Sequence, residues 1–304
     1  MPETSIVPLP RIIASHPRSA LLCPPIYYDV EYAINGQMAQ TLQHISTQKV
    51  DKERAMLQWS RLVGLLDAYG VKMYFMKPRE GLPDMPFTAN AGLLFRGTMA
   101  LSNFKPKERR GEIPHLASFF LEKLTASVVL VPFSRDGNPA PLFFEGQGEA
   151  LYYRDRLFCG YGIRSTREGA HAALAALHFH REHAFLLLTG GPKKEWFYHL
   201  DTCFCPMGED LLWYPPAFSA GAQTAIHSFA KGEHSIEIDE ADAMRFVANG
   251  VYLGGANGRV LITSPMSPAL KERLTARGIT VRENDVSEFL KAGGGNKCLT
   301  FLFN

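Results

Sequence analysis

A cysteine near the end of the sequence lies in a setting that favours nucleophilic chemistry. Three glycines at 293–295 lead into Lys297 and Cys298, and the apolar stretch 299–303 follows. Glycines allow backbone conformations closed to other residues and let a ligand approach closely, and a lysine with exposed backbone amides stabilises a neighbouring thiolate. A buried strand cysteine is the alternative for such a position. The glycine run favours Cys298 as a nucleophile.

A histidine and several acidic residues have the chemistry to assist such a thiol. If 197–202 forms a strand, His199 and Asp201 face the same side, and histidine is the side chain best suited to proton transfer near neutral pH. A structural pair is equally typical of such a strand. Glu145 and Glu149 lie among glycines, which indicates close approach of the backbone to a ligand or a β-turn with surface glutamates.

Other polar residues are candidates for binding a ligand or a metal ion. Asp84 and Asn90 bracket an otherwise apolar segment, and by themselves they are typical of turns and strand ends. His199, Cys203 and Cys205 share one face of the expected strand, but structural zinc takes four ligands, usually in closely spaced pairs. No second pair exists in the sequence, so we expect no metal ion and no other cofactor.

The elements that must position these residues recur as one unit: a strand pair, an amphipathic helix and another apolar strand. Helix starts recur at roughly 50 to 60 residues, as in propellers and other repeat architectures. The predicted helices are 52–69, 114–125, 166–181, 217–230 and 268–277, the strands after them are 71–76, 127–133, 184–189, 235–238 and 279–282, and the strand pairs lie within 86–101, 142–161, 197–214 and 251–263, the last turning at Asn257 and Gly258. A fifth strand pair requires the chain ends, 21–30 and 298–303, to meet.

Repetition around an axis hides sheet edges and gathers the loops of every unit at the centre. We therefore predict an α/β fold, a five-bladed pseudo-symmetric propeller, in which residues 1–304 form one catalytic domain. An open parallel sheet is the alternative that alternating strands and helices leave available.

The composition favours a small molecule as the partner. The 304 residues include 32 basic and 30 acidic side chains for a net charge of +2, so we expect no nucleic-acid surface. The N-terminus lacks the apolar core of a secretory signal, and no apolar run is long enough to cross a membrane. Five cysteines, an odd number, predict free thiols in a reducing, cytoplasmic setting. Whether the protein forms a homodimer is left open by the sequence.

Taken together, these motifs resemble the guanidino-group-modifying superfamily, which includes arginine deiminases, arginine dihydrolases, dimethylarginine dimethylaminohydrolases and amidinotransferases. The resemblance runs in order through 84–92, 144–149, 199–202 and 293–300, and so covers nearly the whole chain. It implies a pentein, the five-bladed α/β propeller, with its active site on the axis. It also implies a hydrolase that cleaves C–N bonds in the guanidino or ureido group of an arginine-like molecule through a covalent cysteine intermediate.

The resemblance assigns roles to individual residues. Cys298 would attack the guanidinium carbon, His199 would protonate the departing amine and then activate water, and Glu145 would hold the imidazole. Asp201 would pair with the planar cation of the substrate, and Asp84 is a further substrate contact.

Five more residues complete the predicted binding set. Arg164 and Arg110 lie where family members hold the substrate carboxylate, for which a guanidinium fork is suited, although surface charge is the alternative for both. Asn90 replaces the acid of deiminases and dimethylarginine hydrolases, and an amide can hydrogen-bond a neutral ureido group. Arginine dihydrolases resemble this chain at Asn90 and around Asn35, a further contact, and Glu149 belongs to the acidic motif.

Two other functions remain open at this point. An amidinotransferase would pass the amidino group from Cys298 to an amine instead of water. A catalytically silent binding propeller is the other alternative, against which Cys298, His199 and Glu145 argue together.

Overall fold

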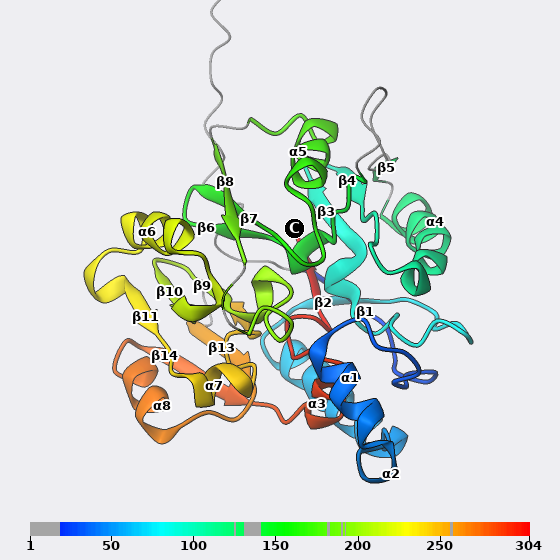
Figure 1. Cartoon of the computed structure of the whole chain (residues 1–304), viewed down its shortest axis with the longest axis horizontal. Coiled ribbons are helices and arrows are strands. Elements are labelled where there is room, and N and C mark those ends of the chain that lie inside the picture. Colours follow the sequence, from blue (N-terminus) through cyan, green and yellow to red (C-terminus); the bar gives the residue numbers. More distant parts are fainter. Residues whose placement is uncertain are drawn as a thin grey trace, which may run out of the picture.

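The computed structural model describes residues 19–124, 126–130, 141–180, 183–189, 191, 193–255 and 258–304. Within these residues the strands form five three-stranded sheets. Figure 1 shows the longer helices around the rim of the molecule and the C-terminal end near its middle. This is the α/β fold in five similar units that the sequence repeat predicts.

All five sheets share one pattern of strand pairing. The middle strand of each sheet pairs antiparallel with one neighbour and parallel with the other. With the antiparallel neighbour first, the sheets are β15 (Phe301–Phe303), β1 (Ser19–Leu22) and β2 (Lys72–Phe75); β3 (Gly92–Phe95), β4 (Thr98–Leu101) and β5 (Ser127–Leu130); β6 (Ala150–Tyr153), β7 (Arg156–Tyr161) and β8 (Ala184–Leu188); β9 (Phe204–Met207), β10 (Asp210–Trp213) and β11 (Ser235–Glu237); β12 (Val251–Leu253), β13 (Arg259–Thr263) and β14 (Ile279–Glu283).

Helices make the connections that the parallel pairs require, because parallel strands need a crossover. One or more helices lie between the middle strand of each sheet and its parallel neighbour: α1 (Gly36–Gln43), α2 (Ile45–Gln48) and α3 (Lys52–Ala68) in the first sheet, then α4 (Ile113–Lys123), α5 (Arg167–Ala176), α6 (Ala220–Phe229) and α8 (Pro268–Thr275). The shorter α7 (Glu240–Met244) and α9 (Ser287–Leu290) precede β12 and β15.

Helix α3 shows how local sequence sets these elements. The Asp51 side chain accepts a hydrogen bond from the N–H of Arg54 and so caps the first turn. Leu62 on its apolar face is fully buried, and the chain leaves the helix through Gly70 in the left-handed region, at φ +74°. The result agrees with the predicted helix at 52–69.

The first and last strands of the ring lie in one sheet. β1 pairs antiparallel with β15, with Leu21 opposite Phe301. The predicted pairing of the chain ends is therefore confirmed, although the strands are shorter than the stretches 21–30 and 298–303.

Some expectations about local structure are wrong. The helix predicted over 166–181 ends at Ala176, because His178 adopts a left-handed conformation at φ +51°. Strand structure is expected around Asn90 and His199, but the chain there forms the 3₁₀ turns η1 (Thr88–Ala91) and η5 (Leu200–Thr202).

Parts of four predictions lie outside the described residues. They are the end of the strand at 127–133, Thr125 and Arg181 at the ends of two predicted helices, and Asn257 in the predicted hairpin turn.

The five sheets meet at a common centre. One strand from each sheet (β15, β3, β6, β9 and β12) contributes to the lining of a single cavity of about 250 Å³. A second, much smaller cavity is lined by Asn90, His199 and Cys298, which lie in the turns before three of these strands. The repeat therefore brings distant parts of the sequence to one place.

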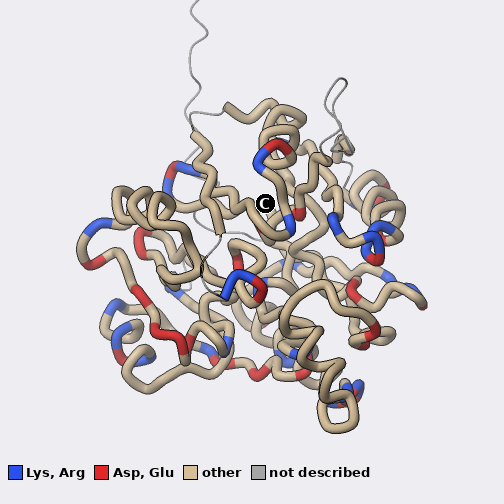
Figure 2. The backbone as a smooth tube through the Cα atoms, in the orientation of Figure 1, with Lys and Arg blue, Asp and Glu red and all other residues tan. Residues whose placement is uncertain are grey.

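The charged residues show no segregation by sign. Figure 2 shows Lys and Arg interspersed with Asp and Glu around the molecule. Among the described residues, none of the helices combines the length and apolarity that crossing a bilayer requires.

Candidate active site

Each strand that lines the central cavity is preceded by a turn that carries a polar residue. Asn90 lies in η1 before β3, Glu145 lies at the start of η3 (Gly146–Gly148) before β6, and Asp201 lies in η5 before β9. Asn249 and Cys298 occupy the corresponding turns before β12 and β15. The propeller thus presents one polar position from each unit to the axis.

The glycines before Cys298 make room for side chains of the protein itself. A Cβ atom on Gly294 would lie 2.2 Å from a ring carbon of Phe87, and one on Gly295 would lie 2.8 Å from Asn249 Oδ1. These glycines let the cysteine turn pack against its neighbours, so close approach of a ligand is not what requires them.

The thiol of Cys298 is buried and has two polar side-chain partners. Its Sγ donates to Asp201 Oδ2 at 3.4 Å and accepts from Asn249 Nδ2 at 3.1 Å. Burial raises the pKa of the thiol well above its usual value, and the charge of Asp201 raises it further, while Lys297 lowers it. The free site therefore holds a protonated cysteine at neutral pH.

His199 and Glu145 form the second part of the site. His199 Nε2 lies 2.8 Å from Glu145 Oε2, and the guanidinium of Arg164 approaches the same carboxylate to 2.9 Å. Burial lowers the pKa of His199 to about 4 despite the carboxylate beside it. Burial opposes the ionisation of Glu145, yet Arg164 and His199 outweigh it and lower its pKa to about 2. The imidazole is neutral near pH 7 and the carboxylate is charged.

Asp201 lies on the other side of the thiol. Burial raises the pKa of Asp201 to about 7, although Lys297 and the hydrogen bonds with Cys298 and Asn249 lower it. Its Oδ1 is buried and has no hydrogen-bond partner. This carboxyl group is poised to ionise when a cation arrives.

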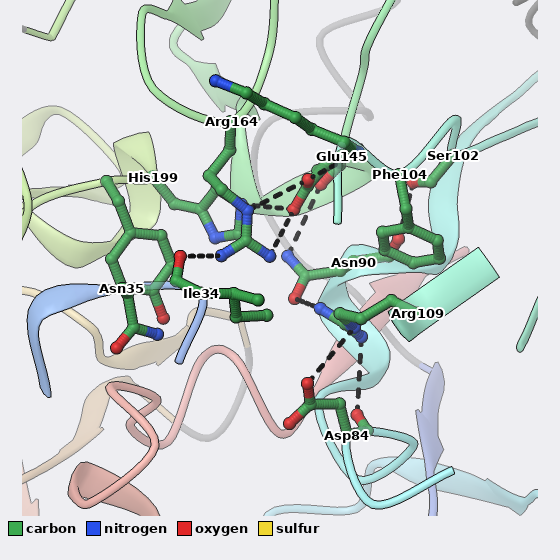
Figure 3. Close-up of polar contacts among 12 residues, drawn as sticks. Ile34, Asn35, Asp84, Asn90, Ser102, Phe104, Arg109, Glu145, Arg164 and His199 are labelled. Carbon is green, nitrogen blue, oxygen red and sulfur yellow. Dashed lines mark hydrogen bonds and ion pairs between the residues drawn. The ribbon is translucent and has the colours of Figure 1, made fainter. Parts of the chain in front are cut away.

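Arg109, and not Arg110, lines the small cavity of Cys298. Figure 3 shows Arg109 between Asn90 and Asp84. Its Nη1 donates to Asn90 Oδ1 at 2.7 Å, and its Nε donates to Glu112 at 2.8 Å. Arg110 is exposed, and its guanidinium bonds backbone carbonyl groups outside the cavity. The structure does not bring Arg110 to the thiol, because neighbouring residues of the 3₁₀ helix η2 (Lys107–Glu112) point in different directions.

Asp84 and Asn35 also line the cavity of Cys298. Asp84 Oδ2 accepts from the hydroxyl of Tyr32 at 2.8 Å, while Oδ1 is buried without a partner. Burial raises the pKa of Asp84, and Arg109 opposes that shift. Asn35 caps α1 through Met38 N at 2.8 Å. Asp84 therefore offers a free acceptor, whereas the amide oxygen of Asn35 is already used.

Two predicted binding residues support the site through contacts with other protein groups; Arg164 also lines the cavity of Cys298, whereas Glu149 does not. Glu149 accepts from Leu200 N at 3.1 Å and so fixes the turn that follows His199. Arg164 is engaged with Glu145 and with Ile34 O at 3.4 Å (Figure 3). The structure therefore gives both a positioning contact.

The cavity of Cys298 is small, with a volume of about 10 Å³. It is large enough for about one water molecule, so a larger ligand enters only if neighbouring groups move apart. Three buried polar atoms on residues around it lack hydrogen-bond partners: Asp84 Oδ1, His199 Nδ1 and Asp201 Oδ1. Such atoms in a native site call for an explanation, and a ligand rich in N–H donors supplies one.

Several residues at this site are absent from the sequence-based set. Arg109, Tyr198 and the cavity-lining Met38 are among its walls, and Asn249 contacts the thiol. The repeat does indicate Asn249. In each of the other four units, a polar residue also lies shortly before the strand that lines the larger cavity. For Met38 and Tyr198 the sequence carries no comparable signal.

The zinc alternative finds no support in the arrangement of the cysteines. Cys203 Sγ is directed at the carbonyl groups of His199 and Leu200, and Cys205 Sγ at that of Gly250. Across the described part of the chain, no three His, Cys, Asp or Glu side chains are grouped so that they could hold a metal ion.

Comparison with known sequences places this site in a family context. A family model described as eukaryotic N,N dimethylarginine dimethylhydrolase matches residues 26–303. The bifunctional arginine dihydrolase/ornithine cyclodeaminase ArgZ of Synechocystis sp. is 41% identical over 92% of this chain, but the chain spans only 37% of that relative's length. An N(G),N(G)-dimethylarginine dimethylaminohydrolase of Mycobacterium tuberculosis is 32% identical over 93% of this chain and 85% of its own length.

Solved structures agree with the sequence comparison. The N-terminal domain of ArgZ, a cyanobacterial arginine dihydrolase crystallised with its substrate, superposes with a TM-score of 0.82 at 38% identity and covers 93% of this chain and 97% of its own. A dimethylarginine dimethylaminohydrolase adduct gives a TM-score of 0.70 at 18% identity over 94% of this chain and 100% of its own. The predicted pentein fold is confirmed.

Proposed function

Because this chain belongs to the dimethylarginine dimethylaminohydrolase family of guanidino-group-modifying enzymes, we propose that it hydrolyses a C–N bond of the guanidino group of arginine. Cys298 is the nucleophile, His199 is the acid and base, and Glu145 holds the imidazole. The substrate forms a covalent thiouronium-type intermediate on the cysteine.

One observation carries this proposal: partnerless acceptors surround a buried thiol. Asp84 Oδ1, His199 Nδ1 and Asp201 Oδ1 are buried acceptors without donors. A guanidinium is a planar cation with five N–H donors, and it matches carboxylate geometry well. A substrate of this class satisfies all three atoms and neutralises the carboxyl groups at the same time.

The chemistry follows from the charges of the site. A cationic substrate draws Asp84 and Asp201 into their ionised forms, and it lowers the cost of ionising the thiol beside it. The thiol proton passes to His199 Nδ1, Sγ forms a bond to the guanidinium carbon, and the imidazolium returns the proton to the departing amine. Water then gives a proton to Nδ1, its oxygen bonds to the carbon, the C–S bond breaks, and the imidazolium returns the proton to the sulfur. Glu145, charged near pH 7, stabilises the transient imidazolium.

Asn90 favours arginine over dimethylarginine as the substrate. Its Oδ1 faces Arg109 and its Nδ2 approaches Glu145 O at 3.5 Å, so the amide adds no negative charge. An amide accommodates both a cationic guanidino group and a neutral ureido group. We therefore propose arginine dihydrolase chemistry, in which a citrulline-like stage is hydrolysed a second time and two ammonia molecules are released.

The test is product analysis with a matched pair of cysteine variants. Wild-type protein is incubated with arginine, dimethylarginine, citrulline and agmatine, with and without glycine as an amidino acceptor, and ammonia, methylamines, citrulline and ornithine are measured. We expect ammonia and ornithine from arginine, no turnover by Cys298→Ser, and near-normal turnover by Cys203→Ser, which changes a buried cysteine outside the cavity.

Two results would overturn the proposal. Ammonia release by a folded Cys298→Ser variant would remove the cysteine from the mechanism. Formation of an amidino-glycine product in place of ammonia would make the protein a transferase.

We also propose a cytoplasmic setting, and that residues 1–304 act as one catalytic domain. All five cysteines are buried and free, which suits a reducing compartment. A homodimer stays a prediction, to be tested by the molar mass in light scattering.

A further inference from the structure

We propose that Asn249 is a catalytic residue: its amide positions the cysteine turn and donates the hydrogen bond that stabilises the Cys298 thiolate. The inference rests on the proposed function, in which this thiol is the nucleophile. It concerns a residue in the turn before β12, which comes from a different unit of the propeller than the cysteine.

The oxygen atoms of Asn249 hold the backbone of the cysteine turn. Oδ1 accepts from Gly295 N at 3.0 Å and from Cys298 N at 3.1 Å. The backbone oxygen of Asn249 accepts from Lys297 N at 3.0 Å. Three of four consecutive amides in this turn therefore depend on one residue.

The nitrogen of the same amide faces the reacting atom. Nδ2 donates to Cys298 Sγ at 3.1 Å and to Asp201 O at 3.0 Å. A side-chain amide has two donors and can accept two hydrogen bonds, so every capacity of this group is used. The side chain is also fully buried, and it makes these contacts without access to water.

The neighbours fix which way the amide points. With the two ends exchanged, the NH₂ group would face the N–H groups of Gly295 and Cys298, and four donors would meet with no acceptor. The hydrogen-bond network therefore assigns Nδ2 to the sulfur side. The missing side chain of Gly295 is part of this arrangement, because a Cβ there would lie 2.8 Å from Asn249 Oδ1.

A donor at this position acts mainly on the ionised form of the thiol. The ionisable groups around Cys298 are Asp201 and Lys297, whose charges act on the thiol, and Tyr198, His199, Asp84, Arg109 and Arg164, which line the same cavity. Asp201 disfavours a thiolate, and Lys297 favours it from the adjacent position in the chain. A hydrogen bond strengthens when its acceptor becomes charged. Together with the backbone N–H of Gly295, the side chain of Asn249 is a neutral group that stabilises negative charge on sulfur without repelling a cationic substrate.

The experiment distinguishes the two roles of Asn249, which are to position the cysteine turn and to stabilise the thiolate. Asn249→Asp keeps the acceptor oxygen Oδ1 and nearly the same volume, but it replaces the NH₂ donor to sulfur with a second acceptor oxygen. Asn284→Asp is the matched control. Asn284 is also buried and bonds Asn296 in the same turn at 2.9 Å, but it makes no contact with the sulfur.

The first readout does not depend on the substrate. Iodoacetamide labelling of the peptide that contains Cys298 is followed by mass spectrometry from pH 6 to 10. We expect Asn249→Asp to be labelled about tenfold or more slowly than Asn284→Asp at each pH, because raising the thiol pKa by one unit lowers the thiolate fraction tenfold. For arginine hydrolysis, we expect kcat to fall on the order of 100-fold with a smaller change in KM.

The outcomes are distinct. Equal labelling profiles of Asn249→Asp and Asn284→Asp would overturn the inference even if wild-type protein hydrolyses arginine. A shifted profile would support it even if arginine is not the substrate. If Asn249→Asp fails to fold, Asn249→Ala removes the amide donor without adding a charge, and slower labelling than in Asn284→Asp is again expected; an unshifted profile in that variant overturns the inference.

Discussion

The two sides of the Cys298 site each contain a buried carboxyl group, and the pKa values of these two groups are shifted in opposite directions. On one side, Glu145 has Arg164 and His199 as direct partners, and its pKa is lowered to about 2. On the other side, Asp201 has a thiol and an amide as its nearest side-chain partners, and burial raises its pKa to about 7. The surroundings of each group, and not its chemical type, decide its charge.

This difference gives the two carboxyl groups different roles in the site. Glu145 carries a permanent charge that orients the imidazole, so its ionisation stabilises the fold above its ordinary pKa, and that contribution is lost as the pH falls toward 2. The protonated form of Asp201 is favoured by folding, and this contribution is lost as the pH rises through about 7. A ligand cation changes only the second group.

The largest effect is expected from Glu145→Gln. This change leaves Arg164 buried without its counter-charge, so the free energy of unfolding falls by about 3 to 5 kcal/mol, and kcat falls on the order of 100-fold or more because the imidazole loses its partner. Urea denaturation and steady-state kinetics measure the two effects.

Glu209→Gln provides the control for that prediction. Glu209 pairs with Arg154 at 3.1 Å, but 72% of its side chain is exposed. Its loss is expected to cost roughly 0 to 1 kcal/mol. Equal losses of stability in the two variants would contradict the contrast between the buried and exposed pairs.

A smaller effect, on substrate recognition, is expected from Asp201→Asn. The lost charge raises KM for arginine on the order of 10- to 100-fold. Since the wild-type carboxyl group must be ionised to pair with a cation, kcat/KM of the wild type falls as the pH decreases through about 7. His199, with its pKa near 4, does not supply this acid limb.

The variant should lack the acid limb near neutral pH. A pH profile of kcat/KM from pH 5 to 9 for both proteins tests this directly. An unchanged limb in Asp201→Asn would assign it to another group, and Asp84, whose pKa is also raised by burial, would be examined next through Asp84→Asn.

The smallest effect is expected from Asn90→Asp. The added charge faces Arg109 and the cavity, so the ratio of kcat/KM for arginine over citrulline rises about tenfold. Competition kinetics with the two substrates gives the ratio. The same ratio before and after the change would show that position 90 does not select the charge of the substrate.

The sequence predicted the ring because its signals are local and repeated. Asp51 and Gly70 mark both ends of α3, and capping side chains also begin α5, α6 and α8. The sequence could not predict that His199 leads into a 3₁₀ turn, since Glu149 fixes that turn through Leu200 N, from another unit. Local signals identify elements, while contacts between units decide their detailed form.

The choice between Arg109 and Arg110 shows the same limit within the site. The two residues are adjacent, and composition or spacing cannot rank them. The ion pair with Glu112 and the bond to Asn90 turn Arg109 inward. The position of Asn249, in contrast, follows from the repeat. The turns before β3, β6, β9 and β15 each carry a polar residue, and Asn249 is the corresponding residue in the turn before β12.

The pairing of β1 with β15 has a consequence for how this fold forms. The pair places Leu21 opposite Phe301, so this sheet joins parts of the chain that are far apart in the sequence. Contacts of that kind are slow to form. Because Cys298 lies in the turn before β15, the thiol takes its place beside Asp201 only once this long-range pairing is made.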